Sequence, residues 1–338
     1  MAQQPFDINA SLAHVKAGGL PIRAQMRLAE EAGPNKRLFT SDLSVSEFLL
    51  VEETKAKPIS QVMGSSVYRI GVVSDYRGGG EQIFEITTIS TGHREARRAA
   101  LSRLFQEARL VGADAVVGVR LRERMITMGR HGKGGDDGGE IIEFTAVGTA
   151  IDANWITRPA NQPVVTDLSG QELWALAQDG FEPCGFLFDF CRYHVWHVLK
   201  DYQRGQGEVG PAQQAIELAR ARVERSITEQ ATKFEAEFVV GSDVSIDIKE
   251  VPCGYESCTL NDLDVSVSWF GTGVRRVPGF APPEHPKAPP LILSMMPLGR
   301  ARSAGFEDED DADEIAELAK EAEKEALAED ESPKERGE

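Results

Sequence analysis

The chain contains an internal repeat, which constrains its fold more strongly than any other feature. Residues 41–48, SDLSVSEF, align with residues 166–173, TDLSGQEL, at an offset of 125. After an irregular stretch the match resumes at an offset of 123. Matches at a nearly constant offset indicate homologous units in one chain. We therefore expect two tandem domains, at residues 38–152 and 163–277.

Both repeats begin with the same helix-start signal and continue with the same order of elements. Ser44 with Glu47, and Ser169 with Glu172, fit a capping box at the start of a short helix. An extended segment, a long helix with apolar residues at helical spacing, and two paired strands follow. The order α–β–α–β–β predicts a two-layer α+β domain with an antiparallel sheet.

Four glycines recur at equivalent positions in the two repeats. Gly118 and Gly241 each follow two valines inside a predicted strand. Glycine weakens a strand unless a β-bulge or a close backbone approach requires it. Gly148 and Gly271 each precede a threonine in the last predicted strand. We expect all four positions to be structural.

Three segments lie outside the repeats. Residues 1–37 form an extension with a short helix expected at 24–32. Residues 278–302 are a proline-rich linker, and residues 303–338 are an acidic tail whose charge density favours disorder. The linker contains an apolar island, which either packs back onto the domains or docks onto a protein partner. The island comprises Leu291, Ile292, Leu293, Met295 and Met296.

Most of the net charge of −17 belongs to the tail. Residues 307–338 hold sixteen acidic and four basic residues, which leaves a net charge of about −5 for the remainder. No basic stripe with interleaved aromatic residues occurs, which argues against nucleic-acid binding. Four cysteines in 338 residues favour a reducing compartment. With no signal-peptide pattern and no apolar run long enough for a membrane span, we expect a cytoplasmic protein.

Three stretches of the first repeat resemble one known family. They are EARLVGADAVVGV at 107–119, VGTAI at 147–151 and VMGSSVYR at 62–69. They are similar to signature segments of the YbjQ-like family, also called the heavy-metal-binding domain. The resemblance covers the first repeat well and the second in outline. It implies a dodecin-like antiparallel sheet and assembly into ring-shaped pentamers, and it implies no particular reaction.

The segment CGFLFDFCRYHVWH, residues 184–197, suggests a divalent metal site. Zinc takes four nitrogen or sulfur ligands, usually in closely spaced pairs such as Cys-x2-Cys, and the spacing here is looser. A continuous strand would divide the candidates between two faces, whereas a helical turn starting near Phe190 would bring two of them together. The candidate ligands are Cys184, Cys191, His194, His197, Cys253 and Cys258.

The competing interpretation of this segment is a buried structural strand without a cofactor. Cys184 aligns with Ile59 and Cys191 with Ser66, two ordinary positions of the first repeat. Free cysteine is also among the most frequently buried residue types. We favour this interpretation and expect no cofactor.

No motif places a nucleophile beside a base, so we expect no catalytic residue. Ser41 and His93 carry suitable groups without such a motif, and we attribute Asp42 and Asp167, which recur, to helix capping. A small antiparallel sheet leaves open edges that ring closure removes. We therefore expect a non-catalytic, ring-forming scaffold. Metal binding or sensing is the second hypothesis, and an unidentified enzymatic activity is the third.

Overall fold

The computed structural model describes residues 7–31, 40–70, 82–127, 140–159, 162–196, 208–252 and 261–280. These residues form helices α1 (Ile8–Lys16), α2 (Ile22–Glu31), α3 (Val45–Glu53), α4 (Thr87–Leu110), α5 (Gly170–Gln178) and α6 (Gly210–Lys233). The strands are β1 (Lys57–Ile70), β2 (Ile83–Glu85), β3 (Ala115–Thr127), β4 (Glu140–Asp152), β5 (Val164–Val165), β6 (Phe181–Val195), β7 (Phe238–Pro252) and β8 (Asn261–Arg276).

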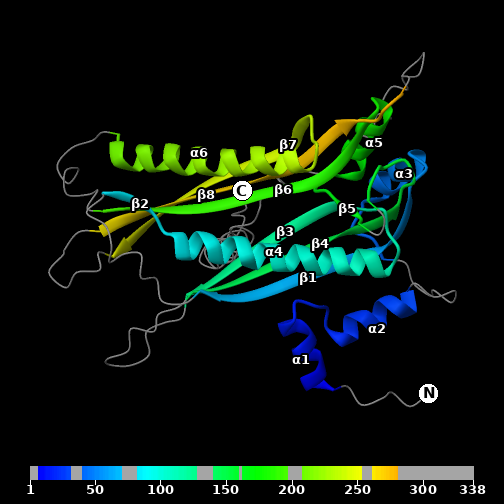
Figure 1. The fold of residues 1–338 in the computed structure, drawn as a ribbon, viewed down its shortest axis with the longest axis horizontal. Helices are drawn as coiled ribbons and strands as arrows, with labels where there is room; N and C mark the ends of the chain where they lie inside the picture. The colour runs from blue at the N-terminus through cyan, green and yellow to red at the C-terminus, as the bar shows by residue number, and fades with distance from the viewer. Residues whose placement is uncertain are drawn as a thin grey trace, which may run out of the picture.

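The strands form two four-stranded sheets. The first sheet has the order β1-β4-β3-β5 and the second has the order β2-β6-β8-β7. Helix α6 packs on the second sheet, while α4 contacts β1 and β4 on one side and β6 on the other. Figure 1 shows the resulting stack of α6, second sheet, α4 and first sheet. Helix α2 packs against α4, and α1 packs against α2. The expected α+β class is confirmed.

The internal repeat extends to the hydrogen-bond register of the strands. Gln61 lies opposite Thr149 in the first sheet, and Phe186 lies opposite Thr272 in the second, at offsets of 125 and 123. Both pairings have an irregularity just after the equivalent prolines Pro58 and Pro183. The two copies therefore share their strand geometry as well as their order of elements.

The predicted helix starts have the expected geometry. Ser44 and Ser169 each accept a hydrogen bond from the amide three residues later, and Glu47 and Glu172 reach back to the cap amides. Each reciprocal cap satisfies two amides that a helix start leaves unpaired. The capping prediction for these four residues is confirmed.

The recurring glycines allow bends and close approaches in the sheets. Gly118 and Gly241 both have φ of +63° at a β-bulge, where a residue with a Cβ is strained. A Cβ on Gly148 would lie 2.8 Å from a methyl of Val116, and one on Gly271 would lie 3.1 Å from Cα of Ser242. The bulged strand thus approaches its neighbour closely in both repeats.

The recurring aspartates have a different role from the one predicted. The backbone amide of Asp42 donates to the Thr149 hydroxyl at 3.0 Å. At the equivalent place Asp167 accepts a hydrogen bond from the Thr272 hydroxyl. These contacts tie the segment before each short helix to the last strand of its repeat. Helix capping, which we predicted for both aspartates, is performed by the serines alone.

Several element bounds differ from the sequence-based expectations. The extended segments expected near Pro58 and Pro183 continue to Ile70 and Val195, because β1 stays paired with β4 and β6 with β8 that far. The extension contains α1 in addition to the helix expected at 24–32, which spans Ile22–Glu31. In the described part of the chain, no helix combines the length and apolarity that a membrane crossing requires. The apolar island and the tail lie outside the described residues.

Candidate assembly interface

The two repeats exchange strands. Strand β2 follows β1 in the chain, yet it pairs with β6 of the second repeat, Ile83 opposite Val195 and Glu85 opposite Tyr193. Strand β5 opens the second repeat, yet it pairs in parallel with β3 of the first. Each sheet is therefore completed by a strand from the other repeat.

Further backbone hydrogen bonds continue both exchanges. The Ile86 amide donates to the Arg192 carbonyl at 2.8 Å, just beyond β2. On the other side the Gly118 amide donates to the Leu168 carbonyl at 2.8 Å, and the Thr166 amide donates to the Val116 carbonyl at 2.9 Å. Backbone groups at a sheet edge need partners when they are buried. The interface provides such partners from the opposite repeat.

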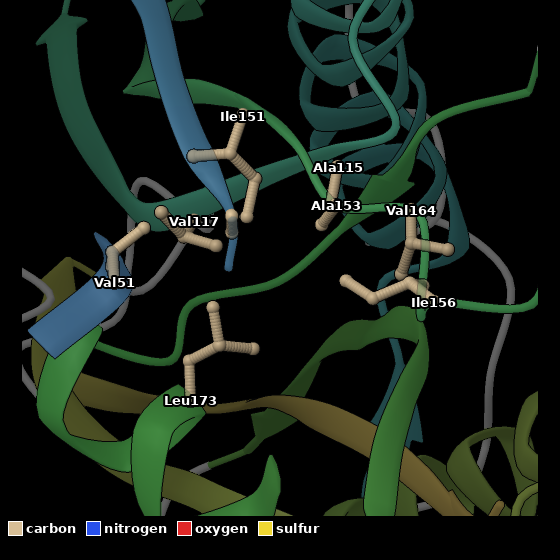
Figure 2. Close-up of a cluster of buried hydrophobic side chains, with 9 residues drawn as sticks. Val51, Ala115, Val117, Ile151, Ala153, Ile156, Val164 and Leu173 are labelled. Carbon is tan, nitrogen blue, oxygen red and sulfur yellow. The ribbon is translucent and has the colours of Figure 1, made fainter. Parts of the chain in front are cut away.

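The repeats also share a hydrophobic core near the short helices. Val51 of α3 and Leu173 of α5 are fully buried in one cluster with Val164 of β5 and residues of β3 and β4. Figure 2 shows these side chains converging from both repeats. Beside this cluster the Trp174 indole donates to the Glu53 carboxylate at 3.0 Å. Burial on this scale stabilises the interface through the hydrophobic effect.

Helix α4 forms the middle of the interface. Its His93 ring stacks on Phe190 of β6, with ring centroids 3.9 Å apart and planes 8° apart. One turn later the Arg97 guanidinium donates to Ser268 of β8 at 3.3 Å. Ser90, one turn earlier, accepts from the Arg192 amide at 3.0 Å. Three successive turns of α4 therefore contact the second sheet.

The same face of α4 carries a buried charged group. Nδ1 of His93 lies 3.0 Å from a carboxylate oxygen of Glu123 on β3, and Arg97 lies 3.4 Å from the other oxygen. Burial lowers the pKa of His93 and outweighs the contribution of Glu123. Burial alone would raise the pKa of Glu123, but His93 and Arg97 lower it. At neutral pH the interface therefore holds a neutral imidazole beside an ionised carboxylate.

A second charged group joins the two long helices at the edge of β6. Asp189 lies 3.7 Å from a nitrogen of Arg94 on α4 and 3.6 Å from a nitrogen of Arg222 on α6. Glu85 of β2 lies 3.5 Å from Arg94 and 4.0 Å from Arg222. The two carboxylates and two guanidinium groups alternate, which reduces the electrostatic cost of burying them.

The structure separates the candidate metal ligands that it describes. Cys184 and Cys191 are seven residues apart on continuous strand β6, which corresponds to about 20 Å. Cys191 faces α6 and its thiol donates to the Ala219 carbonyl at 3.3 Å. His194 faces the other side of the sheet, because successive strand residues alternate. Ligands of one zinc ion lie within about 2.3 Å of it, so these three cannot share an ion.

His194 has carboxylates beside both ring nitrogens. Its Nδ1 lies 2.7 Å from Asp264, and its Nε2 lies 3.4 Å from Asp262. Both ring nitrogens thus face carboxylates of the neighbouring strand β8. Among the described residues no three histidine, cysteine or acidic side chains are grouped to hold a metal ion. His197, Cys253 and Cys258 lie outside those residues.

The interface residues were missed by motif searching because they form no motif. His93 and Glu123 are thirty residues apart and meet only through the fold. The repeat itself contains a usable signal, since at the offset of 123 they align with Ile216 and Ile246. A polar pair in one copy and two isoleucines in the other mark a place where the two copies have different surroundings.

The fold and interface define a tandem-repeat α+β protein whose two halves complete each other's sheets. The YbjQ family model, described as "Putative heavy-metal-binding", matches residues 50–154. Over 269 residues the chain is 31% identical to "Encapsulin nanocompartment protein Rv1762c" of Mycobacterium tuberculosis (strain ATCC 25618 / H37Rv), covering 75% of this chain and 95% of the relative. No solved structure gives a significant match. The chain belongs to the YbjQ-like family.

Proposed function

We propose that the chain is a non-catalytic scaffold whose copies join head to tail. The observation that carries this proposal is the interface inside the chain, which joins one surface of the first repeat to a different surface of the second. Because the repeats are homologous, each also carries the counterpart of the surface that its neighbour uses. The same contacts can therefore form between chains. Head-to-tail contacts either close into a ring or form filaments, and we propose a ring.

The second repeat presents an apolar strip where the first is covered. Val244, Ile246 and Ile248 of β7 are between 43 and 50% exposed. Their equivalents on β3 are Leu121, Glu123 and Met125, which are half-buried. Exposed apolar side chains in a row favour association. Strand β7, which carries the strip, contacts α6 (Figure 1).

The short helices also show one position that is buried in one repeat and exposed in the other. Trp174 on α5 is 5% exposed and packs against α3. Its equivalent at the offset of 125 is Leu49 on α3, which is 56% exposed. A second chain that approaches α3 with its own α5 would cover Leu49. The exposed side of α3 is thus the counterpart of an interface already formed by α5.

The first sheet has an exposed face that corresponds to the face of the second sheet covered by α4. Met63 and Val67 of β1 are exposed on the side away from α4. Their equivalents on β6 are Phe188 and Arg192, which lie against α4 with Arg97 over the Phe188 ring. We propose that α6 of a neighbouring chain packs on Met63 and Val67 as α4 packs on the second sheet.

The exposed edge of β7 supports the proposal. Strand β7 ends the second sheet, as β3 would end the first sheet without β5. Thr40 corresponds to Val165 of β5, and Val239 corresponds to Val116, its partner on β3. The segment that starts at Thr40 would therefore extend the second sheet of a neighbouring chain. An edge strand is a template for such pairing.

The relative from Mycobacterium tuberculosis is named as an encapsulin nanocompartment protein, and neither that name nor the family description denotes a reaction. A role in a large cytoplasmic assembly is therefore our proposal for this chain as well. A ring would also present one acidic tail and one apolar island (residues 291–296) per chain. Several weak sites on one particle bind a partner more tightly than a single site does.

Native mass spectrometry of the full chain tests the assembly. We expect a single closed oligomer at micromolar concentration, and a monomer under these conditions would overturn the proposed function. The apolar strip gives a matched pair of variants. Ile246→Asp should dissociate the oligomer, whereas Leu110→Asp should not. Leu110 is 51% exposed on α4, a helix whose two neighbouring sheets are already in place.

A disulfide tests the arrangement independently of the stoichiometry. Adjacent strands place paired Cα atoms about 5 Å apart, which suits a disulfide. Thr40→Cys together with Val239→Cys should link chains covalently. Val165→Cys together with Val116→Cys should form the equivalent bond within a chain. An oligomer without the interchain bond would overturn this interface but retain the assembly.

A further inference from the structure

His93 is a buried base at the interface between the two repeats, and the proposed scaffold does not use it. The ring is fully buried, stacked on Phe190 and in edge contact with Phe144. Nδ1 lies 3.0 Å from Glu123 without the alignment of a full hydrogen bond. We assign the proton of the neutral ring to Nδ1, because a carboxylate favours a donor beside it. Nε2 is then an acceptor, and it is buried without a hydrogen-bond partner among the described residues.

The charged groups that face His93 lie on its own helix and on two of the strands packed against it. Its own helix supplies Arg97, β3 supplies Glu123, and β6 supplies Arg192. Asp189 on β6 acts on Arg97 from farther away. The residues of β1, β4 and β8 at this place are uncharged, namely Ile70, Ile142, Phe144, Ser266 and Ser268. Two guanidinium groups and one carboxylate therefore surround the imidazole.

A second proton on His93 is unfavourable in this arrangement. The new Nε2–H would have no acceptor, and a buried unsatisfied donor costs about 1–3 kcal/mol. The added positive charge would also lie near Arg97 and Arg192, with only Glu123 to offset it. When the repeats separate, water can solvate the imidazolium. Protonation therefore favours separation of α4 from the second sheet.

The fold does not require a histidine at this position. The equivalent residue of α6 is Ile216, and α6 has the same length and position on its own sheet. The equivalent of Glu123 is Ile246. The arrangement of a base and a carboxylate thus belongs to the interface within a chain alone.

We propose that His93 makes the interface between the two repeats acid-sensitive, so that proton uptake at Nε2 loosens α4 from the second sheet and releases the exchanged strands β2 and β5. The device acts within a single chain, and it holds for a monomer as well as for a ring.

The direction of the pH effect follows from the lowered pKa of His93. An exposed histidine has a pKa of about 6.5, and burial lowers it in the closed interface. The closed form is therefore fully stabilised above about pH 6.5 and loses stability as the pH falls toward the lowered pKa. The opening constant rises by up to about tenfold per pH unit in this window. The lowered pKa of Glu123 adds an acid effect only below about pH 4.5.

Hydrogen exchange of the full chain at pH 7, 6 and 5, corrected for the intrinsic pH dependence of exchange, tests the proposal. The reporting amides are Ile86 and Thr166, which bond across the repeats, and the reference amide is Glu237, which bonds within the second repeat. We expect protection of Ile86 and Thr166 to fall by up to about tenfold per pH unit, with Glu237 unchanged.

Two variants show whether His93 is the cause. His93→Ile introduces the residue of the second repeat, and His93→Gln keeps a donor for Glu123; neither takes up a proton in this range. Both should remove the pH dependence at Ile86 and Thr166. An equal loss of protection in the variants, or no loss in the native chain, would overturn the inference. Native mass spectra of the same samples report the assembly separately, so a monomer that opens in acid would contradict the scaffold and retain this inference.

Discussion

The Trp174 indole on α5 donates a hydrogen bond from Nε1 to the Glu53 carboxylate on α3, 3.0 Å away. The bond joins the first helix of one repeat to the first helix of the other. The equivalent of Trp174 on α3 is Leu49, whose side chain lies in solvent. One position of the repeat thus has two environments, buried in the second copy and exposed in the first.

This difference predicts that two alanine substitutions affect different properties, the stability of the chain in one case and the association of chains in the other. Trp174→Ala should lower the free energy of unfolding by about 3 kcal/mol or more, because it removes a large buried side chain and leaves Glu53 without its donor. Leu49→Ala should change the stability of a dissociated chain by less than about 0.5 kcal/mol. It should nevertheless shift the oligomer toward monomer on dilution. Urea titration and native mass spectrometry measure the two effects, and equal destabilisation by both substitutions would contradict the assignment.

Helix ends give a second prediction. Lys55 and Gly180 occupy the equivalent position after α3 and α5, with φ of +65° and +74°. A residue with a Cβ in this left-handed region costs about 1 kcal/mol, whereas glycine is favoured there. Lys55→Gly should therefore raise the free energy of unfolding by about 0.5–1 kcal/mol.

The matched substitution replaces a glycine at a positive φ with a residue that has a Cβ. Gly112 has φ of +72° after α4, and a Cβ there would touch nothing within 4 Å. Gly112→Ala should therefore lower stability by about 1 kcal/mol through the backbone alone. Thermal and urea unfolding of both variants measure this, and a loss of stability in Lys55→Gly would contradict the assigned cause.

Much of the architecture could be predicted because its signals are local or repeated. Ser44 and Glu47 form a cap within one turn, and Gly118 is a glycine inside a strand, which indicates the bulge that its φ of +63° produces. Strand exchange could not be predicted in this way. Strands β2 and β5 have three and two residues, too few for any periodicity, and their partners are set by the tertiary fold.

The interface was hidden for a related reason. His93 and Phe190 are far apart in sequence and belong to different repeats. The cysteine and histidine segment attracted attention because its composition is unusual, whereas strand alternation decides which of its residues can meet. Comparison of the two copies would have been more informative, because His93 and Glu123 differ from their equivalents where the surroundings differ.

The described cysteines give the last two predictions. Burial, with smaller contributions from Glu85 and Asp189, raises the pKa of the Cys191 thiol to about 12, and burial raises that of Cys184 to about 11. The thiolate is the reactive form, so at pH 8 only about one Cys191 in ten thousand is ionised. Alkylation by iodoacetamide should be about a thousandfold slower at Cys191 in the folded chain than in urea. Peptide mass spectrometry measures each site, and similar rates in the two states would contradict the buried position.

The same residue distinguishes a structural strand from a metal site. In a chain purified without chelator, Cys191→Ser should leave the metal content by elemental analysis unchanged, because Cys191 faces α6 and lies far from Cys184 and across the sheet from His194. The serine hydroxyl can still donate to the Ala219 carbonyl, so the fold should persist and far-ultraviolet circular dichroism should match the native chain. Loss of one bound zinc per chain in this variant would show that Cys191 is a ligand, and would require β6 to differ from the strand described.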